Sequence, residues 1–461
     1  MKSKNAPQTH NFNPQILRAY DIRGIVGDTL TEQDAYFIGK SFGTLLSQSE
    51  GNKKICVGFD GRHSSPVLEE KLVKGLLETG AEVIRIGLGP TPMLYFSVQH
   101  LKANGGIMIT GSHNPPTHNG FKMMKSKLPV YGDEIQELGQ IASSGRFATG
   151  NGVVTFEDVH DDYIEHLFSK YIKSDLKVAW DAGNGAAGDI MKSLTDKLSG
   201  KHILLNEKID GNFPSHHPDP SVKKNMEQLI DAVISNKCDI GIAFDGDGDR
   251  IGVIDNKGNM LYGDQLMSLY AEDVLKHNAG AKIVADVKTS QVLYDLIAQK
   301  GGVPIMWKTG HSLIKTKMAE EKAILGGEMS GHIFFADNFG FDDALYAAVK
   351  LLNIVAKLDC SLSEKIDLLP KTFNTPEIRV YVDEKNKFPI VDEIKQEVKK
   401  SSAKVNDVDG IRTLTKDGWW LLRASNTEAA LVIRCESDSE QGLERLKESI
   451  FGMLQKKGIT V

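Results

Sequence analysis

The alternation of short apolar runs with amphipathic segments most constrains the fold of this chain. Residues 54–59 (KICVGF) are predicted to form a buried strand, residues 67–79 a helix, and residues 82–86 the next strand. This strand–helix–strand order is typical of α/β units, in which helices cover the faces of a sheet. Ligands of α/β proteins bind at the carboxyl ends of the strands, so the loops that leave those ends are the first places to look for chemistry.

The same alternation begins again twice along the chain. The second set of strands is expected at residues 176–180, 202–205 and 239–244, and the third at residues 282–287, 303–308 and 322–327. The three sets have similar lengths, which indicates structural repetition, although no repeated sequence proves it. The prediction is therefore α/β: three related α/β domains with mixed sheets.

The sequence changes in character after Pro370. A strand at residues 378–382, a lysine-rich helix near residues 391–400 and two strands around Gly418 favour a smaller C-terminal α+β domain. A chain of 461 residues exceeds what one hydrophobic core usually organises, and domains of about 100–150 residues are common. We therefore predict four domains, at residues 1–157, 158–259, 260–371 and 372–461.

Charge and cysteine placement exclude several classes of function. A net charge of −6 argues against a nucleic-acid or membrane-surface partner, so an anionic substrate must be held by a local cluster of cations. The four cysteines are far apart and form no CxxC pair, which is typical of reduced thiols in a cytosolic protein. No apolar run approaches the roughly 20 residues that span a bilayer. We expect a cytoplasmic protein that binds a small molecule, with a loose polar arm at residues 1–15.

The first candidate loop is residues 110–115 (TGSHNP), which leaves the predicted strand at residues 106–109. Gly111 relieves backbone crowding beside Ser112, which is expected to be exposed. A serine hydroxyl is a poor nucleophile unless a base or a bound ion assists it. His113 is adjacent, but neighbours in sequence rarely face each other, so it is not assigned as that base. A hydroxyl-capped turn before the two prolines is the structural alternative.

The second candidate loop holds Asp245, Asp247 and Asp249, which alternate with glycines directly after an apolar run. In an extended or gently curved backbone, alternate residues point to the same side, so the three carboxylates should converge. Oxygen donors of this kind suit Mg²⁺. An EF-hand does not fit, because Arg250 and Asn256 stand where that loop needs glycine and glutamate. A solvated acidic turn is the alternative, but carboxylates this close repel one another without a cation.

Two further loops carry groups that can bind a polyol and a phosphate. In residues 326–332 (GGEMSGH), Glu328 and Ser330 can form hydrogen bonds with a polyol, and His332 can exchange protons near neutral pH. Residues 423–428 (RASNTE) offer a guanidinium, hydroxyls and backbone N–H groups, which together make a phosphate nest. Seen alone, residues 326–332 are better explained as a glycine-rich turn with a satisfied histidine, and residues 423–428 are equally well explained as a surface turn.

Taken together, the four loops resemble those of the α-D-phosphohexomutase superfamily. TGSHNP, DGDGDR, GEMSGH and RASNTE occur in this order and at similar spacings. With AYDIRG at 19–24, PTPMLYF at 90–96 and NGFK at 119–122, they are similar to the bacterial phosphomannomutase/phosphoglucomutase group. The similarity extends over residues 13–436. It implies three related α/β domains and a C-terminal domain that closes over a central cleft.

The resemblance also implies an activity. A member of this group is a phosphosugar mutase, an isomerase that interconverts hexose 6-phosphate and hexose 1-phosphate of mannose and glucose. The reaction passes through a phosphoserine, here Ser112, and a hexose 1,6-bisphosphate that serves as intermediate and activator. Mg²⁺ would lie between that phosphate and Asp245, Asp247 and Asp249. We expect no nucleic-acid or membrane partner, and either a monomer or a weak homodimer.

The remaining site residues are implied in the same way. The catalytic candidates besides Ser112 are Lys122, His332, Arg23, Arg250 and His311. The substrate-binding candidates are Tyr20, Lys288, Glu328, Ser330, Arg423, Ser425, Asn426 and Thr427. The chain departs from the family pattern at Ala429-Ala430, where a proline is expected after the glutamate, and this departure could loosen the phosphate loop.

Three other interpretations stay open. A phosphoglucosamine mutase is the nearest, but that group usually has a different residue where Met329 stands. Residues 183–188 form a literal GxGxxG with Glu207 about 20 residues beyond, as a dinucleotide site requires, although the mutase interpretation makes this segment a tight strand-to-helix turn. A non-catalytic sugar-phosphate-binding protein would bind without turnover. The histidines at 216 and 217 are interpreted as part of a loop at a domain interface rather than as a metal site.

Overall fold

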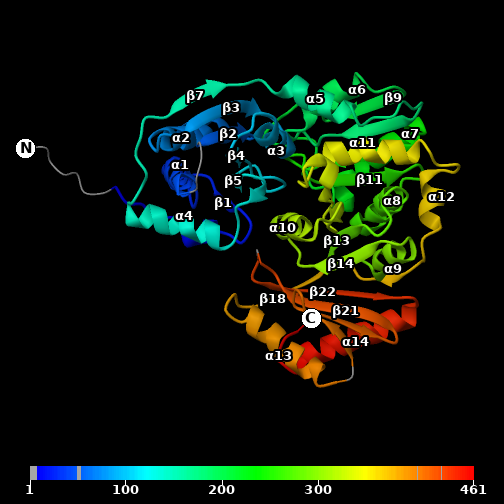
Figure 1. Cartoon of the computed structure of the whole chain (residues 1–461). Helices are drawn as coiled ribbons and strands as arrows, with labels where there is room; N and C mark the ends of the chain where they lie inside the picture. The colour runs from blue at the N-terminus through cyan, green and yellow to red at the C-terminus, as the bar shows by residue number, and fades with distance from the viewer. Residues whose placement is uncertain (1–7, 49–52, 402, 427, 461) are drawn as a thin grey trace, which may run out of the picture.

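The structure is a computed structural model and describes residues 8–48, 53–401, 403–426 and 428–460. Its strands form four sheets, one after another along the chain (Figure 1). Helices pack against each of them, and the first three sheets mix parallel and antiparallel pairs. The predicted α/β class, with a different C-terminal domain, is confirmed. Among the described residues, no helix is both long and apolar enough to cross a membrane.

The first sheet has seven strands. They are β1 (Ile22–Ile25), β2 (Lys54–Phe59), β3 (Glu82–Leu88), β4 (Gly105–Ile109), β5 (His118–Lys125), β6 (Leu128–Pro129) and β7 (Val153–Phe156). Its helices are α1 (Glu32–Ser47), α2 (Ser65–Leu77), α3 (Thr91–His100) and α4 (Asp133–Ser144). Strand β4 ends directly before the TGSHNP loop, and after that loop β5 runs back antiparallel to β4.

The second and third sheets are built from shorter strands. The second contains β8 (Lys177–Asp181), β9 (Lys201–Leu205), β10 (Ile240–Phe244), β11 (Ile251–Asp255) and β12 (Met260–Leu261), with α5 (His160–Phe168), α6 (Gly188–Thr195) and α7 (Glu227–Asn236). The third contains β13 (Lys282–Asp286), β14 (Val303–Trp307), β15 (Leu325–Gly327) and β16 (Ile333–Phe335), with α8 (Gly263–Leu275), α9 (Gln291–Gln299), α10 (His311–Glu321), α11 (Ala344–Val355) and α12 (Leu362–Asp367).

The three sheets share one strand order. It reads β5-β4-β2-β3 in the first, β11-β10-β8-β9 in the second and β16-β15-β13-β14 in the third. In each, the first pair is antiparallel and the other two pairs are parallel. The turn from the second strand of this sheet order to its antiparallel neighbour, which also follows it in the chain, therefore recurs three times. It carries Ser112 in the first sheet, the three aspartates in the second, and residues 328–332 in the third.

The strand expected at residues 322–327 is shorter than predicted. Helix α10 continues to Glu321, and Lys322 closes it in the left-handed region at a φ of 54°. Only Leu325–Gly327 pairs with β13 and β16. Residues 322–324 therefore connect α10 to β15, because an apolar run this short does not separate a connection from a strand.

The C-terminal sheet is antiparallel. It contains β17 (Phe373–Asn374), β18 (Ile378–Tyr381), β19 (Lys404–Asn406), β20 (Ile411–Thr415), β21 (Gly418–Ala424) and β22 (Ala430–Ser437), with α13 (Lys387–Lys399) and α14 (Glu440–Gln455). Alternation along β21 assigns its two faces: Trp420 and Leu422 pack in the cluster that contains α13 and α14, whereas Trp419 and Leu421 pack with Val287 of the third α/β unit. Figure 1 accordingly shows this sheet beside β13 and β14.

The N-terminal arm is not loose over the residues that the structure describes. His10 Nε2 lies 2.7 Å from Asp34 Oδ1, and the His10 ring stacks on Phe37 with a centroid separation of 4.5 Å. Phe12 is buried in the first core. The prediction of a loose arm is therefore wrong for residues 8–15, because two aromatic rings anchor them to α1; residues 1–7 lie outside the described part of the chain.

The core of the first sheet allows a direct test of its packing. Phe42 of α1 is fully buried, whereas Phe156 of the edge strand β7 is 64% exposed. We expect Phe42→Ala to lower the free energy of unfolding of this unit by about 3–5 kcal/mol, because the truncation leaves a cavity. The change is measured by urea unfolding, monitored by the circular dichroism of the backbone. Phe156→Ala is the matched control, and an equal loss in both variants would contradict the packing described here.

Candidate functional site

Ser112 lies in a strained turn at the end of β4. Its φ is 49°, in the left-handed region that non-glycine residues rarely adopt, and the residue is 2% exposed. Its hydroxyl donates to Asp245 Oδ2 at 2.8 Å. The expectation of an exposed serine is wrong: the side chain is turned inward, against the acidic loop of the second sheet.

His113 faces Ser112, contrary to the expectation from their adjacency. Ser112 Oγ lies 3.1 Å from His113 Nδ1. The left-handed backbone at Ser112 brings the two neighbouring side chains to one side. Burial, with a further contribution from Arg250, lowers the pKa of His113 well below its usual value, so the ring is neutral. Sequence reasoning set this residue aside because it assumed an ordinary backbone.

Arg62 fixes the serine loop through hydrogen bonds to its carbonyl oxygens. Its guanidinium donates to the carbonyl oxygens of Ser112, Asn114 and Pro115 at 2.6 Å and of His118 at 3.0 Å. Its Nε donates to Asp60 Oδ2 at 3.1 Å. Arg62 is 1% exposed and Ser112 is 2% exposed, so the contact with the Ser112 carbonyl satisfies a donor and an acceptor that are both buried. A single fork-shaped cation therefore maintains the unusual conformation of the loop.

This arrangement predicts a kinetic effect for Arg62→Lys. Lysine carries three donors on a flexible stem and cannot reproduce the planar fork, so Ser112 should lose its fixed direction. We expect kcat to fall by about 100-fold with little change in KM, since misplacement of about 1 Å has effects of that size. Steady-state kinetics measure both. Arg85→Lys is the control, because Arg85 pairs with Glu69 in the same unit and is 43% exposed at its side chain.

The three aspartates converge in a tight turn rather than along an extended backbone. The N–H groups of Asp249 and Arg250 both donate to Asp245 Oδ1 at 3.1 Å, and Gly248 has a φ of 74°. Carboxylate oxygens of Asp245, Asp247 and Asp249 lie within 4.8 Å of one another, and all three residues are fully buried. The predicted convergence is confirmed, while the reason given for it is replaced by the geometry of the turn.

The aspartate group fits a bound cation. Asp247 Oδ1 and Asp249 Oδ1 accept no hydrogen bond from any described residue, although His332 Nε2 lies 3.3 Å from the latter. Buried carboxylate oxygens without donors are costly unless a positive charge compensates them. Lys122 Nζ supplies part of that charge, 2.7 Å from Asp247 Oδ2 and in contact with Asp249 Oδ2. The remaining oxygens form a set that suits a hard divalent ion.

The surroundings of the aspartates and Lys122 shift their pKa values in different directions. Burial, followed by repulsion from Asp247 and Asp249, raises the pKa of Asp245 well above its usual value. Burial acts the same way on Asp249, but Lys122 and His332 outweigh it and hold its pKa well below that value. Burial opposes the charge of Lys122, yet the carboxylates raise its pKa. Such crowding of like charges is typical of a metal or catalytic site.

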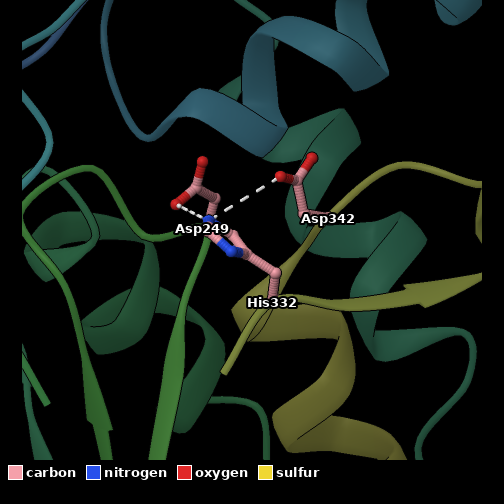
Figure 2. Close-up of side chains that lie close together, drawn as sticks. All are labelled: Asp249, His332 and Asp342. Carbon is pink, nitrogen blue, oxygen red and sulfur yellow. Dashed lines mark ion pairs between the residues drawn. The ribbon is translucent and has the colours of Figure 1, made fainter. Parts of the chain in front are cut away.

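His332 lies between two carboxylates, as Figure 2 shows. Its Nε2 is 3.3 Å from Asp249 Oδ1 and 4.0 Å from Asp342 Oδ2. Its ring stacks on His311 at 5.3 Å, and His311 Nδ1 is 3.3 Å from Asp342. Although burial opposes it, Asp249 raises the pKa of His332 to about 9. Asp342, which no sequence motif singled out, thus lies beside two of the predicted histidines.

Glu328 and Ser330 both contact His332. Glu328 Oε2 is 3.0 Å and Ser330 Oγ 2.9 Å from His332 Nδ1, while Glu328 Oε1 accepts from the N–H of Gly310 at 2.6 Å. Burial opposes it, but the contact with His332 lowers the pKa of Glu328 to about 2, so the carboxylate is ionised. Arg250 Nε also lies 3.3 Å from His332 Nε2. The third loop is therefore joined to the second.

Tyr20 connects the first α/β unit to the C-terminal loop. Its hydroxyl donates to the carbonyl of Thr309 at 2.8 Å and accepts a hydrogen bond from Asn426 Nδ2. Arg23, from β1, donates to Asn114 Oδ1 at 2.8 Å and so lies beside the serine loop. Residues from all four predicted domains thus meet around one site. Thr427, predicted to bind phosphate, lies outside the described residues.

Lys288 and Arg423 form a second group of charges. Lys288 Nζ donates to Glu377 Oε1 at 2.6 Å, and Arg423 Nε donates to Asp409 Oδ2 at 2.9 Å. Ser425 accepts from the N–H of Glu428 and donates its own N–H to the carbonyl of Ala430. The phosphate loop is therefore a hydrogen-bonded turn despite the two alanines.

The glycine-rich segment 183–188 is a strand-to-helix turn between β8 and α6, as the mutase interpretation predicts. The N–H of Ala186 donates to the carbonyl of Gly246 at 2.9 Å, and a Cβ at Gly185 would lie 2.9 Å from the same oxygen. Its glycines therefore permit close packing against the aspartate turn. Nearby, His216 Nε2 contacts Asp181 Oδ2 at 2.9 Å.

Models of one protein family match nearly the whole chain, from residue 14 to residue 453 with short gaps. Four models match in order: phosphoglucomutase/phosphomannomutase alpha/beta/alpha domain I at residues 14–149, domain II at 161–258, domain III at 262–373, and the C-terminal domain at 377–453. Each of the four loops described above falls within a different one of these matches.

Comparison with individual proteins agrees. The chain is 43% identical over 434 residues to a phosphomannomutase/phosphoglucomutase of Pseudomonas aeruginosa, covering 94% of each, and 42% identical to a phosphoglucomutase of Neisseria gonorrhoeae, covering 95% of this chain and 96% of that protein. A crystal structure of a phosphoglucomutase/phosphomannomutase family protein from Burkholderia thailandensis superposes with a TM-score of 0.92 at 40% identity, covering 97% of this chain and 99% of that one. The chain belongs to the phosphoglucomutase/phosphomannomutase family of the α-D-phosphohexomutase superfamily.

Proposed function

We propose that this protein is a phosphosugar mutase that interconverts the 6-phosphate and 1-phosphate of mannose and glucose. The enzyme works through a phosphorylated Ser112 and a hexose 1,6-bisphosphate intermediate. The observation that carries the proposal is the contact of Ser112 Oγ with Asp245, inside a buried acidic group that matches a cation site. Phosphoryl transfer asks mainly for positioning and charge stabilisation, and this arrangement supplies both.

Asp245, Asp247 and Asp249 are proposed to hold Mg²⁺, with an oxygen on Ser112 as a further ligand. When bound, the ion neutralises charge on the phosphoryl oxygens and polarises the phosphorus. The protein's own contribution is to fix the serine in its turn and to exclude water from a buried hydroxyl, which protects a phosphoserine from hydrolysis. The donor set, all carboxylate and hydroxyl oxygen, favours Mg²⁺ over softer ions.

The residues around the serine are proposed to move protons and balance charge. Lys122, His332 and His311 are placed within or beside the acidic group, where they can exchange a proton with the sugar hydroxyl that attacks or leaves. Arg23 and Arg250 contribute positive charge beside Asn114 and His332.

The sugar and its distant phosphate are proposed to bind on the other two loops. Glu328 would accept hydrogen bonds from the hydroxyls at C3 and C4, and Ser330 would donate to them or accept from them. These two positions do not differ between mannose and glucose, so activity on both sugars is expected. Arg423, Ser425 and Asn426, with Thr427, would hold the phosphate that is not reacting, and Tyr20 and Lys288 would complete that end of the site (the latter from β13's loop).

Other expectations remain part of the proposal. The three domain boundaries, after residues 157, 259 and 371, stay a prediction. The placement of cysteines supports a cytoplasmic location, with three of the four buried as thiols. A monomer or a weak homodimer likewise stays a prediction.

A coupled mutase assay tests the function. Mannose 1-phosphate, glucose 1-phosphate and glucosamine 1-phosphate are each supplied with Mg²⁺ and a trace of glucose 1,6-bisphosphate. We expect comparable kcat/KM for the first two and little turnover of the third. Turnover of glucosamine 1-phosphate alone would make the protein a phosphoglucosamine mutase, and absence of turnover with all three would overturn the proposal.

A further inference from the structure

The cations proposed to hold the distant phosphate already have carboxylate partners. Lys288 Nζ lies 2.6 Å from Glu377 Oε1, and Arg423 Nε lies 2.9 Å from Asp409 Oδ2. Arg379 joins two acids, 3.3 Å from Glu377 Oε2 and 3.3 Å from an oxygen of Glu428. The charged members of this group are Lys288, Arg379, Arg423, Glu377, Asp409 and Glu428. Three cations thus face three carboxylates, and Asp286, 3.8 Å from Lys288 Nζ, adds a fourth.

Glu377 is the carboxylate best placed to oppose a phosphate. It precedes β18, in the segment that joins the third α/β unit to the C-terminal domain, and it reaches Lys288 across that junction. Burial opposes its charge, but Lys288, Arg379 and Arg423 together lower its pKa, so it is ionised at neutral pH. A carboxylate thus lies among the three cations that a phosphate dianion would seek.

Glu377 and Asp409 differ in how firmly they are held. Asp409 Oδ2 accepts a backbone hydrogen bond from the N–H of Thr309 at 3.1 Å and therefore forms part of the loop framework. Among the described residues, Glu377 oxygens contact only the side chains of Lys288 and Arg379, and its own side chain is 26% exposed. Its contacts can break without disturbing the backbone, and Lys288 has a second carboxylate, Asp286, at 3.8 Å.

We propose that Glu377 is a resident carboxylate that competes with the substrate's distant phosphate for Lys288, and so weakens phosphate binding to a level that permits release. Lys288 has donors left for a phosphate, but its charge is partly neutralised while Glu377 stays in contact with it, so it attracts the phosphate less strongly. The inference rests on the proposed function, in which the bisphosphate must leave this position and turn once in each cycle. A group of unpaired cations would bind the dianion tightly and slow that turn.

Removing the charge of Glu377 should therefore strengthen binding. Calorimetric titration with glucose 6-phosphate compares Ser112→Ala with Ser112→Ala/Glu377→Gln, so that no turnover disturbs the heat. We expect about tenfold tighter binding in the double variant, since one anionic charge is removed at contact distance from a partly exposed site. Glu377→Asp, which keeps the charge, should bind more like the parent. Glu444→Gln, on the surface of α14 beside Lys447, is the charge-matched control.

The kinetics of the otherwise native enzyme provide an independent readout. With Ser112 present, Glu377→Gln should lower both KM and kcat, because the phosphate is held more tightly in the ground state and released more slowly. A residue that merely positions Lys288 would have the opposite effect on KM. A raised KM, or unchanged or weaker binding of glucose 6-phosphate in the double variant, overturns this inference alone. Failure of Ser112→Ala to bind any hexose phosphate would overturn the proposed function as well.

Discussion

Ser112→Ala is expected to lower kcat by about four orders of magnitude or more while the protein stays folded. The hydroxyl is the only group of this residue that contacts Asp245, and without it no phosphoenzyme can form. The measurement is kcat with glucose 1-phosphate and Mg²⁺, together with phosphate content by intact mass before and after incubation with glucose 1,6-bisphosphate.

The control for this experiment is the neighbouring loop residue Thr117→Ala. Thr117 is exposed and its hydroxyl contacts only His118 within the described structure, so activity should be retained. Near-normal turnover by Ser112→Ala would show that another residue carries the phosphoryl group, and a mass increase in that variant would point to the same conclusion.

Asp247→Asn should raise the Mg²⁺ concentration needed for half-maximal activity by about 100-fold or more, because loss of groups that only support a metal ligand already has effects of about 10–100-fold. Asparagine preserves the shape of the side chain but removes the negative charge that attracts Lys122 and would attract a divalent ion. Activity is measured across a Mg²⁺ titration after removal of metal with a chelator.

Asp231→Asn serves as the matched change, since Asp231 is exposed on α7 of the same unit and has no part in the acidic group. Its Mg²⁺ dependence should equal that of the unaltered enzyme. An unchanged Mg²⁺ requirement in Asp247→Asn, or full activity after exhaustive chelation, would remove the aspartate turn from the proposed metal site.

The strands were the most predictable part of the fold. β2 and the start of β3 coincide with their predicted positions, because buried strands are uninterrupted apolar runs bounded by polar turns. The short connection between α10 and β15 was not predictable, since Ala323 and Ile324 are as apolar as Leu325 of the strand. The packing of His10 on Phe37 was missed for another reason: a polar segment with two aromatic residues shows no periodicity.

The site was predictable where residues lie close in sequence and much less where they do not. The aspartate turn and the serine loop could be found from their own motifs. The contact of Arg62 with Ser112 joins residues 50 positions apart, and that of Tyr20 with Asn426 joins residues 406 apart. Such pairs depend on how the units dock, which no local pattern encodes. Glu377 belongs to this second kind, although its Thr-Pro-Glu segment offered no signal of a role.

The common strand order of the three α/β sheets has a consequence for how this chemistry can change. Each of the three loops forms the same connection, the one between the antiparallel pair of its sheet. The strand order around it is therefore the same whatever residues the loop contains. The proposed sites for the nucleophile, the ion and the sugar thus occupy equivalent connections of one repeated scaffold. Exchange of a single loop can alter one capacity while the other two persist, which gives the architecture a modular route to new substrates.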